Sequence, residues 1–576
     1  MSSNSSQTDK DDKVFIEGLP IKDEYVQEIL CGIFKDYQRV VIKDKFGGGF
    51  ASDHVLLVQP VRKLCPPEYE SPYVVKIAHK DIIEKEEEAH RRLRKILPIL
   101  PLDHSPVFTK DDQYGGLKYD VVGGSAFEYI SFHDYIFEHS PKDAQFVLKK
   151  QILKQMDAMW SYVITVPAFP IGASYDRVLP VNFTVLLQKP FPNITSKMIA
   201  PDDILYKKLE INDNVYLKGF VVDEREENED GTYNVTLSCP ARDDKLPASR
   251  RVRLCQVKAK YMEQFETDGV IQKHISCQIT ETRISFLKKC LQEACDTPLD
   301  FNLKTLTLVS NYNSIELPNP LIELPIILRR YLDVRLAHIH GDLNLRNILV
   351  EKSTRSINLI DFADARQDHV LHDMLRLETS IVTKVLSSAL KNMNLTPENI
   401  YIVYVGLHQE IVLEKPFQIE AFLSSMFKKY AGDELANFPK FSHEKHFDAF
   451  SKSFEKAFNL LKVIRIWARH HLHNFDDYAE YYTCLSIYLL GSIKFKELDR
   501  FTKLVAFWGA ATSQKLMNDP QASVLKKLYA YDPGQFHPSD DVDNTIPSVK
   551  YSESLGVFEK YHTEKTILEE DNDTTE

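Results

Sequence analysis

Short runs of apolar or alternating residues in the first quarter of the chain predict a β-rich region. Alternation with a period of two is typical of strands that bury one face. The predicted strands lie at 40–43, 54–58, 73–78, 107–109 and 117–122. An amphipathic helix is predicted between the third and the fourth of them, from about Asp81 to Leu97, where a proline follows.

The pattern changes further along the chain. Between 197 and 260 short alternating runs return, and we expect a small antiparallel β module, similar to an OB-fold, that interrupts the surrounding domain. A short helix is predicted at 326–332, just past Pro325. Apolar residues three and four positions apart predict longer helices elsewhere. These cover 141–163, 373–392, 397–413, 454–473, 475–493 and 497–517.

The order of the predicted elements indicates an α+β chain in which a β-rich lobe precedes a helix-rich lobe. The β module divides the second lobe into two parts. The expected segments are a tail and lead-in (1–35), the β-rich lobe (36–125), the first part of the helix-rich lobe (126–195), the β module (196–278), the rest of the helix-rich lobe (279–531) and a disordered acidic tail (532–576).

The charge balance argues against a surface built for nucleic acids. With 83 acidic and 71 basic residues, the formal net charge is −12. The basic stretch at 242–260 could form a local patch, and an ordinary solvated strand face is the alternative. No apolar run reaches the roughly 20 residues that span a bilayer, and residues 1–13 lack the apolar core of a signal peptide. We therefore expect a cytoplasmic protein without a membrane span.

Three oxygen-bearing side chains are predicted to meet at one edge of a β-hairpin. Two apolar runs, at 348–350 and 357–360, flank a short polar connector and predict the hairpin. Asp342 and Asn347 precede it, and Asp361 follows it. Carboxylate and amide oxygens are the ligands that hold Mg²⁺ on nucleotide phosphates, and a carboxylate can orient an acceptor hydroxyl. The set therefore has the composition needed for phosphoryl transfer.

This stretch resembles the catalytic core of the protein-kinase-like superfamily. His340–Gly341–Asp342, with Asn347 five residues on, matches the H-x-D-x-x-x-x-N loop, and Asp361 in D-F-A-D takes the place of the D-F-G aspartate. H-G-D instead of H-R-D is the style of the branch that contains aminoglycoside phosphotransferases, choline kinases and fructosamine kinases. The resemblance implies a bilobal fold with a β-rich small lobe and a helical large lobe.

The same resemblance implies roles for individual residues. Asp342 would be the catalytic base, and His340 would support its loop. Asn347 and Asp361 would hold Mg²⁺ on the phosphates of ATP. Asp373, in H-D-M-L-R-L-E, would be a structural aspartate that anchors the loop. ATP and Mg²⁺ are thus the expected cofactors, and the acceptor is an unidentified small molecule or protein.

A kinase-like small lobe also needs a glycine turn, a lysine on the third strand and a glutamate on the next helix. Lys76 lies in the predicted third strand, and Glu86 lies inside the apolar stripe of the predicted helix. A buried carboxylate needs a partner, so we expect a Lys76–Glu86 pair that binds the nucleotide. An ordinary hairpin turn and an edge-strand lysine are the alternatives. The expected phosphate-binding turn contributes Gly47, Gly48, Gly49, Phe50 and Ser52.

A narrower resemblance comes from the inserted β module together with the phrases at 56–60 (L-L-V-Q-P) and 359–366 (L-I-D-F-A-D-A-R). In these features the chain is similar to the ternary-complex-associated kinase-like domains of bacterial signalling and conflict proteins. Arg346 departs from the small-molecule kinase pattern and could order an anionic acceptor or pair with a loop acid. Two other functions stay open: a nucleotide-binding scaffold or regulator (a pseudokinase), and nucleic-acid binding through 250–260.

Overall fold

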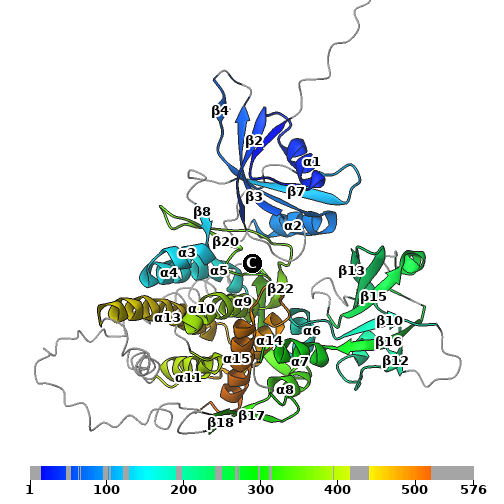
Figure 1. Ribbon diagram of the computed structural model, residues 1–576, viewed down its shortest axis with the longest axis vertical. Coiled ribbons are helices and arrows are strands. Elements are labelled where there is room, and N and C mark those ends of the chain that lie inside the picture. Colours follow the sequence, from blue (N-terminus) through cyan, green and yellow to red (C-terminus); the bar gives the residue numbers. More distant parts are fainter. Residues whose placement is uncertain are drawn as a thin grey trace, which may run out of the picture. The chain divides into compact units, whose positions relative to one another are not determined.

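The structure is a computed structural model of the chain, shown as a ribbon in Figure 1. It describes residues 14–46, 54–62, 64, 66–94, 102, 105–120, 129–189, 197–240, 249–265, 270–271, 273–295, 299–309, 314–392, 395–414 and 440–520. The predicted glycine turn and both predicted tails, 1–13 and 532–576, lie outside these residues. The described part is mixed α/β, in agreement with the predicted fold class at that level.

The N-terminal sheet has seven strands in the order β1-β2-β3-β5-β7-β6, with β4 paired to β3. The predicted strands are all present. The elements are β1 (Phe15–Gly18), α1 (Glu24–Ile33), β2 (Arg39–Phe46), β3 (His54–Arg62), β4 (Glu68–Tyr69), β5 (Tyr73–His79), α2 (Lys80–Leu93), β6 (Val107–Phe108) and β7 (Tyr114–Asp120).

One prediction about this sheet is wrong, because residues 14–35 are not merely a lead-in. Strand β1 pairs in parallel with β2, and α1 buries Val26, Ile29 and Leu30 against the sheet. A four-residue strand carries too little alternation to be recognised from its own pattern, and its pairing supplies the missing information.

The alternation of β5 assigns its side chains to the two faces of the sheet. Val75 and Ile77 share a core with α1, whereas Val74 and Ala78 pack with Ile83 of α2. Lys76 has the same parity as Val74 and Ala78, so it points to the face that α2 covers. The sheet geometry therefore directs a lysine into an apolar layer, where its charge needs a partner.

A second seven-stranded sheet has its own hydrophobic core, which includes Val185, Val215 and Leu254. Its order is β11-β12-β16-β10-β15-β14-β13. The elements are β10 (Phe183–Leu187), β11 (Lys197–Ile199), β12 (Asn214–Leu217), β13 (Val221–Glu227), β14 (Thr232–Ser238), β15 (Val252–Lys258) and β16 (Ile275–Thr282).

The expectation of a purely antiparallel module is wrong. The sheet is mixed, because β10 pairs in parallel with β15 and β11 pairs in parallel with β12. It also begins earlier than predicted, at Phe183, and ends later, at Thr282. Periodicity identifies a strand but not its partner, and β10 and β15 are far apart in the sequence.

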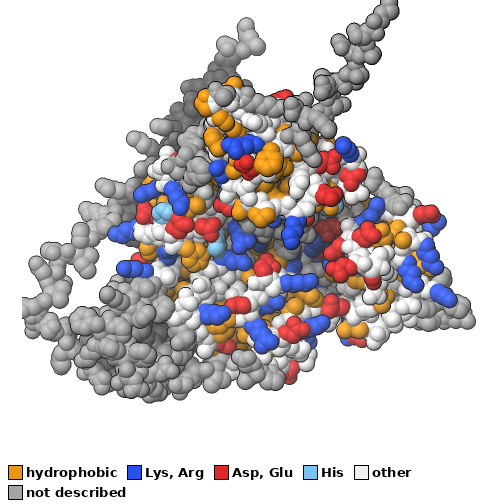
Figure 2. Space-filling view, turned by 45° about the horizontal axis from the view of Figure 1, so that its top comes forward, with side chains coloured by type: hydrophobic (Ala, Val, Ile, Leu, Met, Phe, Trp, Pro, Cys, Tyr) orange, Lys and Arg blue, Asp and Glu red, His pale blue; other side chains and the backbone are white. Residues whose placement is uncertain are grey.

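Two arginines among the described residues of the basic stretch are paired with acids from within the molecule. Arg250 pairs with Asp202, and Arg253 pairs with Glu226. The guanidinium of Arg251 donates to the backbone carbonyls of Arg177 and Leu179. Figure 2 likewise shows acidic and basic side chains interspersed over the face that it draws. These contacts favour the solvated strand face over a nucleic-acid site.

Helices make up most of the remaining described residues. They are α3 (Phe132–Glu138), α4 (Pro141–Phe146), a π-helix (Val147–Ile152), α5 (Leu153–Trp160), α6 (Ile171–Tyr175), a 3-10 turn (Asp176–Val178), α7 (Arg283–Gln292), α8 (Pro320–Ile327), α9 (Leu371–Ile381), a second π-helix (Val382–Leu386), α10 (Ser387–Asn392), α11 (Ile400–Ile411), α13 (Lys440–Arg469), α14 (Ala479–Ser492) and α15 (Arg500–Asn518). None of the helices in the described ranges is long and apolar enough for a membrane crossing.

Three small sheets lie among these helices, in the orders β22-β19-β9, β21-β20-β8 and β17-β18. The predicted hairpin is present, since β20 and β21 pair antiparallel with Ile348 opposite Leu359. Their strands are β8 (Tyr129–Ser131), β9 (Ile164–Pro170), β17 (Thr305–Val309), β18 (Ser314–Pro318), β19 (Tyr331–Ile339), β20 (Ile348–Glu351), β21 (Ile357–Leu359) and β22 (Arg366–His369).

The helix predicted at 326–332 is misplaced. Helix α8 begins at Pro320 and ends at Ile327, and Tyr331 already belongs to β19. The Asn319 side chain accepts a hydrogen bond from the Leu321 N–H, and proline is favoured in the first helical turn. The cap at Asn319 thus sets the start of the helix, and Pro325 lies inside it.

A buried ion pair links three of the long helices. Glu378 of α9 accepts hydrogen bonds from Arg465 of α13 (Nη2 at 2.6 Å) and from the Tyr481 hydroxyl of α14 (2.5 Å). The Arg465 guanidinium also lies 4.2 Å from the centre of the Tyr404 ring. Glu378 and Arg465 are both fully buried. Each charge is tolerated because the other is present.

Replacing Glu378 with Gln leaves the Arg465 charge buried without its acid. We expect the free energy of unfolding to fall by about 3–5 kcal/mol. Asp476→Asn is the matched control, because Asp476 is exposed and pairs with Arg469 at 3.4 Å, which is worth about 1 kcal/mol or less. Urea unfolding followed by fluorescence measures both. Equal losses in the two variants would contradict the role of the buried pair.

Candidate active site

The Lys76 ammonium joins the N-terminal sheet to the end of the β20–β21 hairpin. Its Nζ lies 2.5 Å from Glu86 Oε2 and 2.6 Å from Asp361 Oδ1. Lys76 and Asp361 are 285 residues apart in the sequence. The Tyr119 hydroxyl donates to the other oxygen of Glu86, at 2.5 Å. The expected Lys76–Glu86 contact is therefore present, and Asp361 joins it.

Electrostatics keep this lysine charged although it is buried. Burial by itself lowers the pKa of Lys76, but the carboxylates of Glu86 and Asp361 outweigh that effect and raise the pKa above its ordinary value. Burial and the neighbouring Glu86 also raise the pKa of Tyr119, so its hydroxyl remains a donor. Lys76 is 2% exposed and Glu86 is fully buried. The cluster holds an ammonium facing the partly exposed Asp361.

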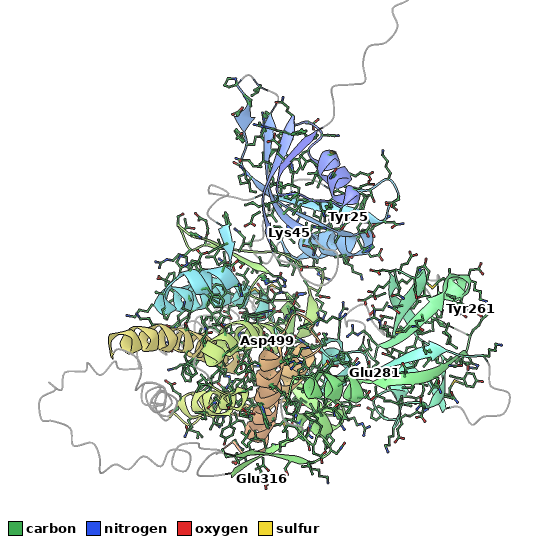
Figure 3. The ribbon with its side chains drawn as sticks, viewed as in Figure 1. Tyr25, Lys45, Tyr261, Glu281, Glu316 and Asp499 are labelled. Carbon is green, nitrogen blue, oxygen red and sulfur yellow. The ribbon has the colours of Figure 1, made fainter. Side chains whose placement is uncertain are left out.

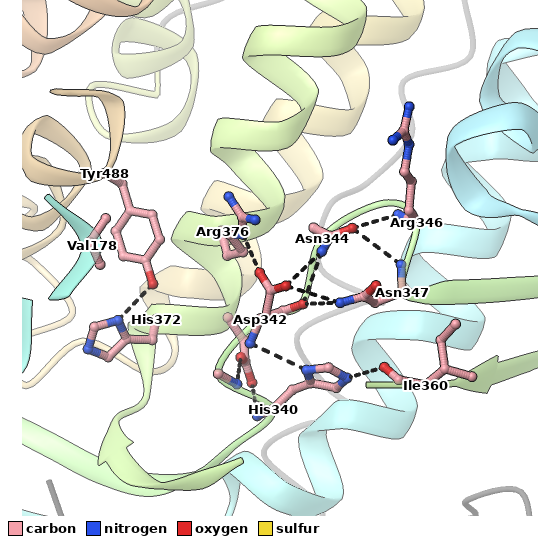
Figure 4. A network of polar contacts seen from close by, with 12 residues as sticks. Val178, His340, Asp342, Asn344, Arg346, Asn347, Ile360, His372, Arg376 and Tyr488 are labelled. Atoms are coloured by element: carbon pink, nitrogen blue, oxygen red, sulfur yellow. Dashed lines mark hydrogen bonds and ion pairs between the residues drawn. The ribbon is translucent and has the colours of Figure 1, made fainter. Parts of the chain in front are cut away.

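The Asp342 carboxylate is oriented by three donors, as Figure 4 shows. Arg376 Nε of α9 lies 2.6 Å from Oδ1. The side-chain amides of Asn344 and Asn347 donate to Oδ2 at 3.0 and 3.2 Å. The Asp342 side chain keeps 29% of its surface exposed. A carboxylate can accept about four hydrogen bonds, so Asp342 retains capacity for a further donor from solvent.

The backbone before Asp342 is held by two buried side chains. The Asp373 carboxylate accepts the N–H groups of His340 (2.8 Å) and Gly341 (2.9 Å), as well as the indole N–H of Trp160 (3.0 Å). His340 Nε2 lies 3.0 Å from the Ile360 carbonyl and Nδ1 lies 3.4 Å from the Asp342 N–H. The neutral Nε2–H tautomer satisfies both contacts. These bonds tie the loop to the strand that precedes Asp361.

Gly341 is required at its position by its backbone and by its surroundings. Its φ angle is +86°, which lies in the left-handed region that side chains other than glycine rarely adopt. A Cβ atom there would lie 2.2 Å from the Asp364 carbonyl oxygen. The loop and the D-F-A-D turn are thus in backbone contact, which explains the glycine of H-G-D in this chain.

Asn347 and Asp361 each keep one oxygen available. The Asn347 amide nitrogen donates to the Asp342 carbonyl at 2.9 Å, so its Oδ1 faces away from that bond. Asp361 uses Oδ1 for Lys76. Within the described ranges neither the other Asp361 oxygen nor Asn347 Oδ1 has a hydrogen-bond partner. Asp361 also has a φ of +69°, and such strained backbone is enriched at functional sites.

The residues expected to form the phosphate-binding turn (Gly47, Gly48, Gly49, Phe50 and Ser52) lie outside the described residues. Strand β2 leads to that turn, and Figure 3 labels Lys45 near its end. A pocket of about 200 Å³ lies between this strand end and the loop that carries Arg346. Arg346 is exposed and makes no ion pair with a described residue. The pocket is lined by Asp44, Lys45, Ile130, Ser131, His133, Asp134 and Arg346.

Sequence reasoning missed Arg376, Asn344, Tyr119 and Trp160 as parts of this site. Arg376 lies three residues after Asp373, so both project from one face of a helix. That spacing was a usable signal. No comparable signal marks Tyr119 or Trp160, because a buried aromatic residue in an apolar run normally belongs to the core. Only the hydrogen-bond partner of its hydroxyl or indole N–H shows a second role.

Comparison with known proteins identifies the family. A family model for ternary complex associated domain 9 matches residues 38–494. The chain belongs to this family. The match extends over the N-terminal sheet from β2 onward, the second sheet and the loop of Asp342, and it confirms the expected ternary complex associated domain.

Two solved structures similar to this ternary complex associated domain are kinases by their titles. An amicoumacin kinase in complex with AMP-PNP, Ca²⁺ and Ami is 11% identical, with 83% of this chain and 88% of that chain covered and a TM-score of 0.26. A glucosamine kinase is 8% identical, with 83% of this chain and 94% of that chain covered and a TM-score of 0.26. No curated protein matched the chain.

Asp373→Asn tests the anchoring of the loop. The substitution places an amide NH₂ against one of the two backbone N–H groups, and one buried donor loses its acceptor. We expect a loss of about 1–3 kcal/mol in unfolding free energy. Asp36→Asn, at an exposed position, is the control and should leave stability unchanged. Thermal unfolding measures the difference, and an unchanged melting temperature in Asp373→Asn would rule out the anchor.

His471 predicts a loss of stability in mild acid. The ring is buried, packs edge-on against Trp160 at 5.6 Å, and lies 3.6 Å from Asp157. Burial lowers its pKa from 6.5 to about 3. Between these values the unfolded chain binds a proton that the folded chain excludes, so stability present above pH 6.5 falls as the pH falls.

The contribution of His471 is at most about 1.4 kcal/mol per pH unit. Urea midpoints measured from pH 7.5 to 5.5 should decrease, and His471→Gln should make that slope shallower. His79→Gln, at an exposed position, should leave the slope as it is. An unchanged slope in His471→Gln would contradict the prediction.

Proposed function

We propose that this protein transfers a phosphoryl group from ATP to a hydroxyl acceptor in a Mg²⁺-dependent reaction. The observation that carries the proposal is the position of Lys76, whose ammonium contacts both Glu86 and Asp361. A strand lysine paired with a helix glutamate, next to an aspartate of metal-binding type, is the arrangement with which kinase-like enzymes bind ATP phosphates. Glu86 lies on the helix that follows the strand of Lys76, whereas Asp361 comes from a segment 285 residues away, so its arrival at the same ammonium needs an explanation beyond local packing.

In this proposal the fold is bilobal and kinase-like. The N-terminal sheet with α1 and α2 corresponds to the small lobe, and the helices from α3 onward correspond to the large lobe. The second sheet is an inserted module of the OB type. Cofactors are ATP and Mg²⁺, and the acceptor is a small molecule or a protein.

The available donors suit Mg²⁺. Asn347 Oδ1 and Asp361 Oδ2 are the hard oxygen ligands that this ion prefers. When bound there, the ion would neutralise part of the negative charge on the phosphates. Lys76 would add its ammonium to the phosphate oxygens, and Glu86 would keep that ammonium in place.

The chemical step requires mainly positioning from the protein. The acceptor hydroxyl oxygen forms a bond to the γ-phosphorus, while the bond from that phosphorus to the bridging oxygen of ADP breaks. The hydroxyl proton passes to the Asp342 carboxylate. Arg376, Asn344 and Asn347 orient this carboxylate, and Asp373 and His340 hold its loop.

A nucleotide-binding scaffold is the second candidate function. The second sheet favours it, because its separate hydrophobic core makes it a substantial structure beyond what phosphoryl transfer requires. Such a protein would bind nucleotide through Lys76 and Asp361 without turning it over. ATP turnover by the unmodified protein distinguishes the two functions.

Asp342→Asn should retain nucleotide binding and reduce Mg²⁺-dependent ATP turnover by about a hundredfold or more, because the proton acceptor is removed. Asp361→Asn should abolish turnover and the effect of Mg²⁺ on binding. Thermal shift with ATP, with and without Mg²⁺, measures binding, and ADP release measures turnover. Retained turnover in Asp342→Asn would exclude the catalytic role, and absent turnover in the unmodified protein with intact binding would favour the scaffold.

Glu86→Gln and Glu84→Gln form a matched pair on helix α2. Glu86 holds Lys76, whereas Glu84 is 53% exposed and lies 3.9 Å from Lys80. Nucleotide binding should weaken in the first variant only.

A further inference from the structure

Lys494 is a cation without an acid, next to the proposed catalytic residues. It lies between α14 and α15, and its Nζ donates to the Val178 carbonyl at 2.8 Å. The ammonium also lies 5.4 Å from the centre of the Phe495 ring. Among the described residues no carboxylate lies within ion-pair distance of it. A cation in a crowded position with only a carbonyl for a partner is unusual.

The charges around Lys494 are positive as well. Arg376 lies over the same Phe495 ring, at 5.9 Å. Arg177 lies in the same 3-10 turn as Val178. The Arg251 guanidinium donates to the Arg177 carbonyl at 3.0 Å. Burial, followed by Arg251, Arg376, Arg283 and Arg177, lowers the pKa of Lys494 well below its ordinary value. Like charges gathered in this way repel one another and are stabilised when an anion joins them.

The carboxylates nearby are already engaged by other partners. Asp176 accepts from Arg283 at 2.9 Å and from the Arg250 N–H at 2.6 Å. Asp364 pairs with Arg177 at 3.2 Å, and Asp342 pairs with Arg376. Each of these acids forms an ion pair with one arginine, and none of them lies within ion-pair distance of Lys494. Lys494 and Arg251 are therefore left without an acidic partner among the described residues, beside arginines that each have one.

Access and location fit a ligand site. Lys494 is half-buried, and the side chains of Arg177 and Asp364 are 38% and 41% exposed, so solvent reaches the cluster. A path of contacts runs from Lys494 through Phe495 and Arg376 to Asp342. Figure 4 shows Val178, Arg376 and Asp342 within one close view. An anion bound here would sit beside the carboxylate that orients the acceptor.

We propose that Lys494, Arg177 and Arg376 bind the anionic group, a phosphate or a carboxylate, of a small-molecule acceptor whose hydroxyl faces Asp342. The identification of the ligand as the acceptor depends on the proposed function. The anion site itself depends on the cluster alone. Lys76 and Asp361 already serve the nucleotide in the proposed function, so this second group of cations is left for the other substrate. Arginine and lysine together are well suited to such anions, because the guanidinium presents paired donors and the ammonium adds a point charge.

The test uses the full chain and two simple anions, inorganic phosphate and malonate, at constant ionic strength with chloride as the reference. We expect at least one of them to raise the melting temperature in a saturable manner. In Lys494→Gln the concentration for half of that effect should rise about tenfold, because one charge-assisted contact is lost. Lys496→Gln, an exposed lysine two residues away, is the matched control and should respond as the unmodified protein does.

Lys76→Met separates this site from the nucleotide site. An anion effect that persists in Lys76→Met and weakens in Lys494→Gln supports the proposal. An effect that weakens only in Lys76→Met, an equal effect in Lys494→Gln and Lys496→Gln, or no saturable effect at all overturns it. The melting temperature of Lys494→Gln without anions should equal or exceed that of the unmodified protein, since repulsion is relieved, and a lower value would also count against the site.

Nucleotide binding, measured separately with ATP and Mg²⁺, should persist in Lys494→Gln. If ATP fails to bind the unmodified protein while the anion effect still depends on Lys494, the proposed function is wrong and the anion site stands without its assignment to an acceptor.

Discussion

A buried ammonium requires carboxylates, and that requirement organises the site. Lys76 lies on the apolar face of a sheet strand, where its charge is stable only because Glu86 and Asp361 are within hydrogen-bond distance. Glu86 positions α2 against the sheet, and Asp361 ties the end of the β20–β21 hairpin to the same point. The packing agrees with this, since Leu349 and Ile360 of the hairpin segment share a core with Val74 and Ala78. One lysine thus couples the two regions on which the proposed chemistry depends.

The second organising feature is the fixed backbone before Asp342. Two N–H groups bind the Asp373 carboxylate, and the His340 ring bridges to the Ile360 carbonyl. Gly341 allows the loop to approach the D-F-A-D turn more closely than any side chain would permit. Asp342 and Asp361 are therefore held relative to one another by a network of buried hydrogen bonds. Such a network is costly to disturb and well suited to a site that must keep its geometry.

Beyond this core the molecule carries charges that the proposed phosphoryl transfer alone does not use. Arg283 and Arg251 of the second-sheet region are directed at the turn around Asp176 and Arg177. Through that turn the second sheet contributes to the basic cluster around Lys494. If the cluster binds the acceptor, the inserted sheet would take part in acceptor selection. Its role would then be part of the reaction and not separate from it.

Local signals in the sequence were enough for many of the elements and for the polar residues Lys76, Glu86, Asp342 and Asp361, but not for β1 or for the position of α8. Alternation marked the strands, three- and four-residue spacing marked the helices, and Glu86 stood out because a carboxylate interrupted an apolar stripe. Those signals are local, and so are the motifs around Asp342 and Asp361. What only the tertiary structure decided was pairing: the parallel partners of β1 and β10, the arginine that meets Asp342, and the cations that surround Lys494. These depend on contacts between distant segments, which periodicity does not encode because each segment carries its own pattern and not the identity of its partner.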